Sequence, residues 1–182
     1  MLKKRDLHES GQLFELLSHP AVFPYVRQKA QSAEEYKFVT KQAIEAEDRG
    51  ELISRTILDD YGQPIGTINL FDIEDGAGFL GTWIGQPFQG LGYNQKAKQQ
   101  FLDELFFVHG IQNVFLRIRK VNAKSLRAAS KLPYVIDAAS THPQLLKELN
   151  KEEDIYALFQ IPRDLYYLTQ AQQPQETDEQ AI

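Results

Sequence analysis

The chain has 182 residues, of which 42% are hydrophobic, which is enough for one proper core and too few to make two independent domains the expected arrangement. Its 20 basic and 25 acidic residues give a net charge of -5, which excludes a general electrostatic attraction to nucleic acid or to an anionic membrane. The absence of cysteine excludes disulfides, a cysteine nucleophile and thiolate metal sites.

The N-terminus begins with basic residues, but residues 7–12 do not form the apolar core of a signal peptide. No uninterrupted apolar run approaches the roughly 20 residues of a membrane-spanning helix. We therefore expect a soluble, cytoplasmic protein with a single domain over residues 1–170. Residues 171–182 are polar and are expected to form a disordered tail.

The first clear element in chain order is a helix over residues 33–48. Ser32 and Glu35 have the spacing of a capping box, in which each side chain satisfies the other's backbone N–H group. Apolar residues then recur at helical spacing, and Gly50 follows as the stop signal. We expect this helix to cover a sheet or a cleft.

A β-hairpin is predicted next, over residues 52–73, with its turn at the residues 59–64 that are rich in Asp, Gly and Pro. A third strand follows at residues 79–85 and is interrupted by Gly81. A glycine inside a strand predicts either a bulge or a close approach by another backbone.

The second half of the chain begins with a helical pattern over residues 94–109, which Gly110 ends. A short strand at 114–118 follows, and the order strand, helix, strand implies a parallel crossover. The remaining pattern predicts a helix over 123–132, a strand from about 134, a helical segment around 143–149 and a final strand over 155–160.

Residues 86–93 connect the glycine-interrupted strand to the long helix, where free backbone amides and the positive end of a helix dipole face outward. Gly90 and Gly92 let the backbone turn these amides inward and leave room for a ligand. The pattern predicts an anion site suited to a pyrophosphate, although the glycines alone also fit a plain tight loop. A P-loop and a Rossmann fingerprint both fit poorly, because the required lysine and third glycine are missing.

The turn resembles the phosphate motif of the GNAT superfamily of acetyl-CoA-dependent N-acetyltransferases. That motif is glutamine or arginine, two free positions, glycine, one free position, then glycine or alanine. Gln89 and Gly92 match it at the right spacing, and Asn94 departs from it. Downstream, residues 122–125 and 131–134 are similar to the asparagine, serine and lysine-leucine-glycine-phenylalanine pattern of the RimJ/RimL branch.

Two strands extend the resemblance upstream, since residues 80–85 and 64–68 look like the glycine-bearing strands of that branch. The similarity therefore covers about residues 50–160. It implies an α/β (α+β) fold of the GNAT type: a mixed, mostly antiparallel central sheet with a splayed parallel strand pair and flanking helices.

The resemblance also implies that acetyl-CoA is the cosubstrate and that its pyrophosphate is held by backbone amides of the turn. Asn94 either crowds the phosphates or caps the helix with its side chain. Asn122 and Ser125 are implied to meet coenzyme A near its thiol; equally, Asn122 caps a helix with Ser125 in its first turn, and the two roles are compatible. The cofactor-binding residues implied are Trp83, Ile84, Gln89, Gly90, Leu91, Gly92, Tyr93, Asn94, Asn122 and Ser125.

Two residues are candidates for the catalytic acid. The Ser125 hydroxyl is placed by the resemblance as a donor to the departing thiolate, and Tyr134 is a second candidate, although an aromatic residue there also suits the core. No strong base is found, because Phe79 and Ala129 stand where related enzymes carry acid or base groups. One of Asp72, Glu74 and Asp75 could relay a proton through water, but we expect these three to be solvated turn residues.

The expected partners are acetyl-CoA and the primary amine of a small molecule, an antibiotic, a peptide or a protein N-terminus. No metal site is expected, because the four histidines are scattered without metal-ligand spacing. We expect a monomer or homodimer. The alternative function is a catalytically silent module of the same fold that binds or senses acyl-CoA, as the apolar Phe79 and Ala129 suggest.

Overall fold

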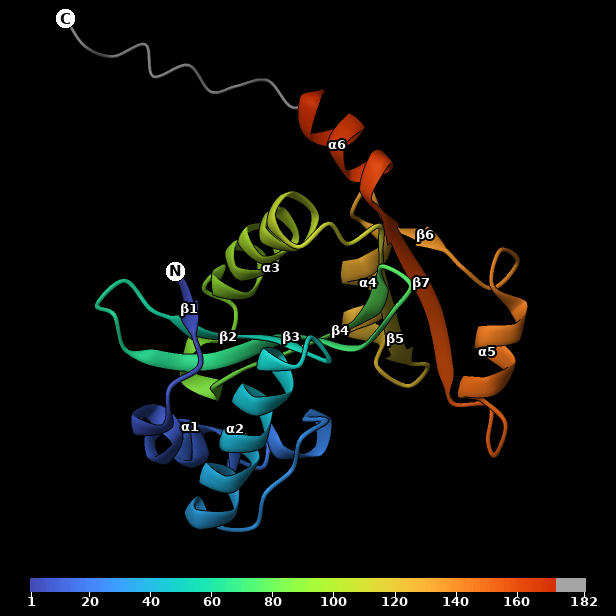
Figure 1. Cartoon of the computed structure of the whole chain (residues 1–182). Coiled ribbons are helices and arrows are strands. Elements are labelled where there is room, and N and C mark those ends of the chain that lie inside the picture. The colour runs from blue at the N-terminus through green and yellow to red at the C-terminus, as the bar shows by residue number, and fades with distance from the viewer. Residues whose placement is uncertain (173–182) are drawn as a thin grey trace, which may run out of the picture. The chain divides into compact units, whose positions relative to one another are not determined.

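The structure is a computed structural model that describes residues 1–172. The chain divides into two compact units, Met1–Ile111 and a second that begins at Gln112 (Figure 1). The single domain over residues 1–170 stays a prediction. From residue 173 onward, the predicted tail lies outside the described residues.

The first unit is built on an antiparallel arrangement of four strands, in which each strand pairs with the next along the chain. Helices α1 and α2 lie on one face of these strands and helix α3 on the other (Figure 1). Short 3-10 turns, η1 (Leu7–Glu9), η2 (Phe23–Tyr25) and η3 (Gln86–Phe88), connect them. The longer elements are β1 (Leu2–Lys4), α1 (Ser10–Leu17), α2 (Ala33–Asp48), β2 (Ile53–Leu58), β3 (Pro64–Glu74), β4 (Ala77–Ile84), α3 (Tyr93–Asp103) and the π-helix η4 (Glu104–Val108).

Helix α2 begins and ends at the residues that the sequence predicts. The Ser32 hydroxyl accepts the Glu35 N–H at 3.1 Å, but the Glu35 carboxylate accepts the N–H of Gln31, at 2.6 Å. The reciprocal bond of the predicted capping box is therefore displaced by one residue. At the other end, Gly50 has φ +76, and the N–H groups of Gly50 and Glu51 bond back to the last turn, which is the Schellman arrangement.

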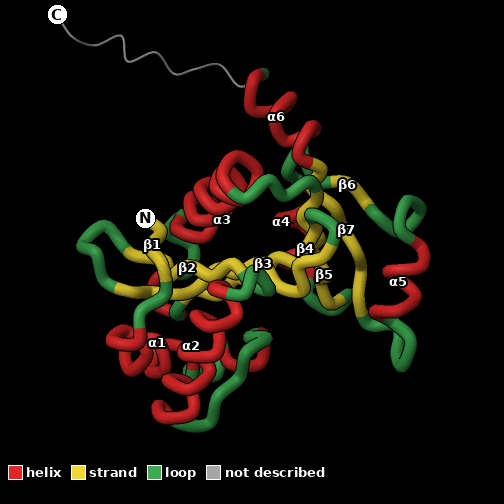
Figure 2. The backbone as a smooth tube through the Cα atoms, viewed as in Figure 1, coloured by secondary structure: helices red, strands yellow, loops and turns green. Residues whose placement is uncertain are grey.

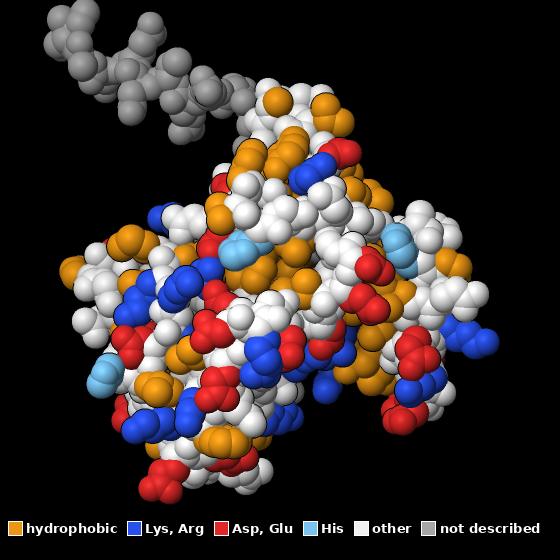
Figure 3. Space-filling view, viewed as in Figure 1, with side chains coloured by type: hydrophobic (Ala, Val, Ile, Leu, Met, Phe, Trp, Pro, Cys, Tyr) orange, Lys and Arg blue, Asp and Glu red, His pale blue; other side chains and the backbone are white. Residues whose placement is uncertain are grey.

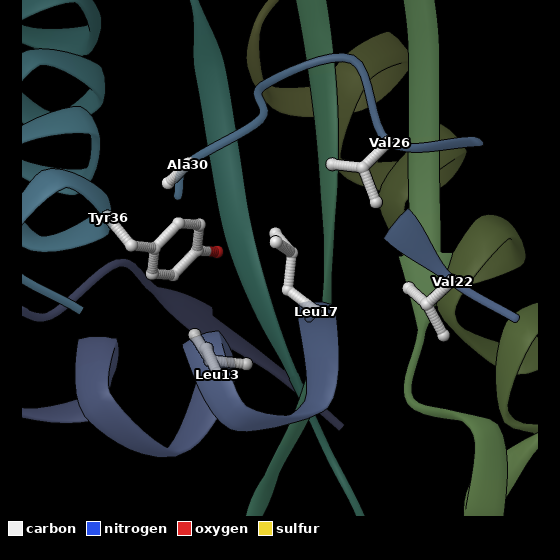
Figure 4. Close-up of a cluster of buried hydrophobic side chains, with 6 residues drawn as sticks. All are labelled: Leu13, Leu17, Val22, Val26, Ala30 and Tyr36. Atoms are coloured by element: carbon white, nitrogen blue, oxygen red, sulfur yellow. The ribbon is translucent and has the colours of Figure 1, made fainter. Parts of the chain in front are cut away.

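The core on this face is formed by α1, α2 and the segment between them. Figure 4 shows the Tyr36 ring of α2 facing Leu13 and Leu17 of α1, with Val22 and Val26 contributed by the connection. Leu13 and Leu17 are fully buried, so the helices are held to each other by removal of apolar surface from water.

The predicted hairpin is confirmed as β2 and β3, but the prediction of a bulge at Gly81 is wrong. The register of β3 with β4 is continuous from Gly66 opposite Ile84 to Phe71 opposite Phe79. A Cβ atom on Gly81 would lie 2.7 Å from the Phe71 ring, so the glycine makes room for a cross-strand aromatic side chain. The approaching group is thus a ring and not a backbone.

A buried ion-pair cluster links β2 to two helices of this unit. Arg55 donates to Glu47 of α2 at 2.7 Å and, through Nε, to Glu104 of η4 at 2.9 Å. Burial lowers the pKa of Arg55, but the hydrogen bonds to Glu104 and Glu47 outweigh it, so the pKa is raised. In the same layer, burial raises the pKa of Tyr36, and the nearby Arg5 opposes that rise.

The predicted helix over residues 94–109 is present in two parts. Helix α3 covers Tyr93–Asp103, and the π-helix η4 continues to Val108, where the His109 N–H bonds back to the Glu104 carbonyl. Gly110 follows with φ +67 and ends the helical path, as predicted.

The second unit has three antiparallel strands, with β7 paired to both β5 and β6. Its first helix ends at residue 130, two residues before the predicted end, and the strand predicted from residue 134 begins at Ile136. A final helix, α6, was not predicted. The elements are β5 (Asn113–Arg119), α4 (Ala123–Ser130), β6 (Ile136–Asp137), α5 (Pro143–Leu149), β7 (Tyr156–Pro162) and α6 (Arg163–Ala171).

Both units contain helices and strands (Figure 2), and every strand pairing within a unit is antiparallel. The predicted fold class, a mixed α/β fold with mostly antiparallel strands and flanking helices, is confirmed. Between residues 1 and 172, no helix combines the length and the apolar content needed to span a bilayer.

Candidate functional site

The turn between β4 and α3 contains two glycines in the left-handed region. Gly90 has φ +80 and Gly92 has φ +86, a conformation that costs a residue with a Cβ atom roughly 1–2 kcal/mol. A Cβ atom at either position would meet no other atom within 4 Å. Glycine is therefore required here by the backbone conformation and not by crowding.

This conformation leaves a row of backbone donors unused. The N–H groups of residues 90–94 donate to no acceptor among residues 1–172, and the first donors into the helix are Gln95 and Lys96, each 3.1 Å from the Gly92 carbonyl oxygen. Gly92 is the N-cap and supplies no side-chain cap. Unpaired amides at the positive end of a helix form an anion-binding geometry. Five of the predicted cofactor residues are thus brought together: Gly90, Leu91, Gly92, Tyr93 and Asn94.

Side chains of the turn fix its path against neighbouring elements of the same unit. The Gln89 amide donates to the Ile84 carbonyl at 3.0 Å, and the Asn94 amide oxygen accepts the Thr82 hydroxyl at 3.3 Å. The interpretation of Asn94 as a helix cap is therefore wrong, because its side chain binds β4. The Tyr93 hydroxyl donates to Asp60 at 3.1 Å. Desolvation and this carboxylate raise the pKa of Tyr93.

The two predicted residues of β4 have side chains engaged within the first unit. Ile84 is buried, and Trp83 is partly buried against the cluster formed by α1, α2 and their connection. Whether they line a cofactor stays a prediction.

In the second unit, Asn122 is the N-cap of α4. Its side-chain oxygen accepts the Ser125 N–H at 3.1 Å, so the predicted capping role is confirmed. Tyr134 is buried, and its ring packs edge-on against Tyr166 of α6 with centroids 5.1 Å apart. The interpretation of Tyr134 as a core residue is supported by this packing; the catalytic roles predicted for Ser125 and Tyr134 stay predictions.

Asp72 is not a simply solvated turn residue. It has φ +53, and its carboxylate pairs with Arg27 at 2.6 Å, while the same guanidinium lies 4.3 Å from the centroid of the Phe71 ring.

Among residues 1–172, no group of three His, Asp or Glu side chains is placed to hold a metal ion. On the face drawn in Figure 3, cationic and anionic side chains are intermixed over α1 and α2.

One residue near the turn was missed by the sequence interpretation. Lys98 lies on α3 among the buried residues Ala97, Phe101 and Leu102, and it is itself partly buried. Its ammonium group makes no hydrogen bond or ion pair with any residue in the described part of the chain, and burial lowers its pKa. The available signal was a lysine inside the apolar stripe of an amphipathic helix.

Solved structures share this fold. A spermidine N-acetyltransferase from Vibrio cholerae, in complex with CoA and spermine, is 14% identical over 92% of this chain and 97% of that chain, with a TM-score of 0.74. FdhC, described as a nucleotide-linked sugar GNAT, is 16% identical over 94% and 90%, with a TM-score of 0.75. A ribosomal-protein-S5-alanine acetyltransferase from Vibrio fischeri is 15% identical over 90% and 92%, with a TM-score of 0.70.

At these identities the structural similarity shows the fold alone. The sequence model of the family described as "Acetyltransferase (GNAT) domain" matches residues 2–135, most of the chain. The protein therefore belongs to the GNAT acetyltransferase family. A comparison with curated proteins found no match.

Proposed function

We propose that this protein is an acetyl-CoA-dependent N-acetyltransferase of the RimJ/RimL-like branch, which acetylates a primary amine on a small molecule, a peptide or a protein N-terminus. The observation that carries the proposal is the turn at Gly90–Asn94, with two glycines at positive φ and five unpaired N–H groups at the start of α3. Family membership and the relative that holds CoA support the choice of ligand.

The turn would hold the pyrophosphate of acetyl-CoA through the backbone N–H groups of residues 90–94. Because these groups are fixed by the backbone before a ligand arrives, little reorganisation is needed when the anion binds. The roles of Asn122 and Ser125 near the thiol, and of Tyr134 as an acid, are predictions carried by the resemblance alone.

The proposed reaction is a direct transfer in a ternary complex. The neutral amine attacks the thioester carbonyl, the new N–C bond forms, and the C–S bond breaks as the tetrahedral intermediate collapses. The amine gives up one proton and the coenzyme A thiolate takes one up. The products are an N-acetylated amine and free coenzyme A.

A pair of glycine variants tests the cofactor assignment by calorimetry with acetyl-CoA. Gly92→Ala and the matched control Gly50→Ala replace glycines with similar φ values, +86 and +76, and neither new Cβ atom would meet an atom within 4 Å. Both should cost about 1 kcal/mol of stability, but only Gly92→Ala should weaken acetyl-CoA binding. Failure of the unsubstituted protein to bind acetyl-CoA would refute the proposal.

The second candidate function is a silent acyl-CoA-binding module, favoured by the apolar residues Phe79 and Ala129 at positions where acid or base groups are expected. It is distinguished by measuring thiol release from acetyl-CoA across a broad screen of amines. Binding with thiol release supports the enzyme, and binding without release from any amine supports the module. The cytoplasmic location, the lack of a nucleic-acid partner and the monomeric or homodimeric state stay predictions.

A further inference from the structure

Lys98 occupies a position on α3 that should not suit a cation. Its neighbours along the same helix face, Ala97, Phe101 and Leu102, are buried, and no carboxylate or other acceptor among residues 1–172 binds its ammonium group. Removing a charge from water without a partner is costly.

The spacing along α3 places Lys98 on the same helix face as Asn94, the last residue of the phosphate turn. Residues four apart lie on the same face of a helix, so Lys98 lies directly below Asn94. Side chains on a helix tilt toward its N-terminus, and four residues correspond to a rise of about 6 Å, which the four-carbon stem of a lysine spans. Asn94 is the last of the residues with an unpaired N–H group, and its side chain faces β4 through Thr82.

We infer that Lys98 is a ligand-binding residue that supplies the counter-charge for the diphosphate of coenzyme A at the turn Gly90–Asn94. This inference rests on the proposed function. The turn offers partial positive charge from its amides, and a lysine one helical turn away adds a full charge in a partly desolvated place, where charge interactions are less screened. Ligand binding would provide the partner that the free protein does not give to Lys98.

Lys96 provides a matched control on the same helix. It lies two residues before Lys98, on the exposed side of α3, and it takes part in no ion pair within residues 1–172. Lys96→Met and Lys98→Met therefore remove the same charge at nearly the same distance from the turn along the chain. The two variants differ in the place of the lysine that is removed. Lys98 is partly buried and lies on the helix face that carries Asn94, whereas Lys96 is exposed.

The experiment measures the Kd for coenzyme A by calorimetry for the unsubstituted protein, Lys98→Met, Lys98→Arg and Lys96→Met, at low and at high salt. Lys98→Met should raise the Kd about tenfold at low salt. At high salt, the ratio of its Kd to that of the unsubstituted protein should be smaller, because salt screens the charge interaction. Lys98→Arg should retain most of the affinity, and Lys96→Met should remain within about twofold. Lys98→Met should also melt at a higher temperature than the unsubstituted protein, because it removes an unpaired charge from the apolar stripe.

Three results would overturn the inference. An unchanged Kd in Lys98→Met would show that Lys98 does not act on the ligand. Equal losses of affinity for coenzyme A in Lys98→Met and Lys96→Met would show an effect of net charge only. A loss of affinity in Lys98→Met that does not depend on salt, or an equal loss in Lys98→Arg, would show a packing effect. These results differ from failure of the proposed function, in which the unsubstituted protein itself does not bind coenzyme A.

Discussion

Replacing Arg55 with methionine should strongly destabilise the first unit, because it removes the guanidinium that pairs with the carboxylates of Glu47 and Glu104. Among residues 1–172, Glu47 would keep only the Ser54 N–H, and Glu104 only the contact with His109. The side chain of Arg55 is 5% exposed, and those of Glu47 and Glu104 are 17% and 25% exposed. Breaking a buried ion pair by removing one partner costs about 3–5 kcal/mol. Partial exposure of the two glutamates places the expected loss near the lower end, about 3 kcal/mol. For a protein of this size, that corresponds to a melting temperature lower by about 6–12 °C.

The chain contains a matched control for this prediction. Arg49 also pairs with a glutamate through two hydrogen bonds, but Arg49 and Glu51 are 56% and 59% exposed. Arg49→Met should therefore change the free energy of unfolding by less than about 0.5 kcal/mol. The assay is chemical and thermal unfolding followed by circular dichroism. Adding Glu47→Gln and Glu104→Gln to Arg55→Met should recover part of the loss. Similar effects of Arg49→Met and Arg55→Met would refute the reasoning.

Three further predictions concern packing, ionisation and capping. Gly81→Ala should cost about 1–3 kcal/mol of stability, because the new methyl group overpacks against the Phe71 ring. The double variant Gly81→Ala/Phe71→Leu should lose less stability than the sum of the two single losses. Additive losses would show that residues 81 and 71 are not in contact. The pKa of Tyr36 is raised, so its contribution to stability should be complete below the usual value of about 10 and should fall as the pH rises from there toward its folded pKa. Urea unfolding at several pH values should show a smaller fall in the free energy of unfolding with pH for Tyr36→Phe than for the unsubstituted protein, and equal slopes would contradict the prediction. Asn122→Ala should cost about 1 kcal/mol and Asn122→Asp much less, and an unchanged melting temperature in Asn122→Ala would argue against the cap.

The parts of the fold that were predictable from sequence are those fixed by local signals. Ser32 and Gly50 mark the ends of α2, because a side-chain oxygen and a residue at positive φ satisfy the free backbone groups of a helix. Helices α1 and α6 have only 8 and 9 residues, and helices this short depend on tertiary packing. The function of Gly81 depends on a ring across the sheet, which periodicity along one strand cannot reveal.

The candidate site was predictable where it consists of backbone and less so where it depends on packed side chains. Gly90 and Gly92 indicated the turn because glycine is the residue that adopts positive φ readily. The partner of Asn94 could not be predicted, because Thr82 is brought close only by the turn of the chain after β4. Lys98 was visible as a charged residue in an apolar stripe, but its lack of a partner required the structure.

The unpaired amides of residues 90–94 have an evolutionary consequence. A site made of main-chain N–H groups is inherited through the shape of the chain, so selection acts on the backbone angles at Gly90 and Gly92 more than on side-chain chemistry. Positions such as Leu91, which is 64% exposed, are then free to change in sequence without loss of the backbone donors. Such a site can persist in homologues whose overall sequence identity has become very low.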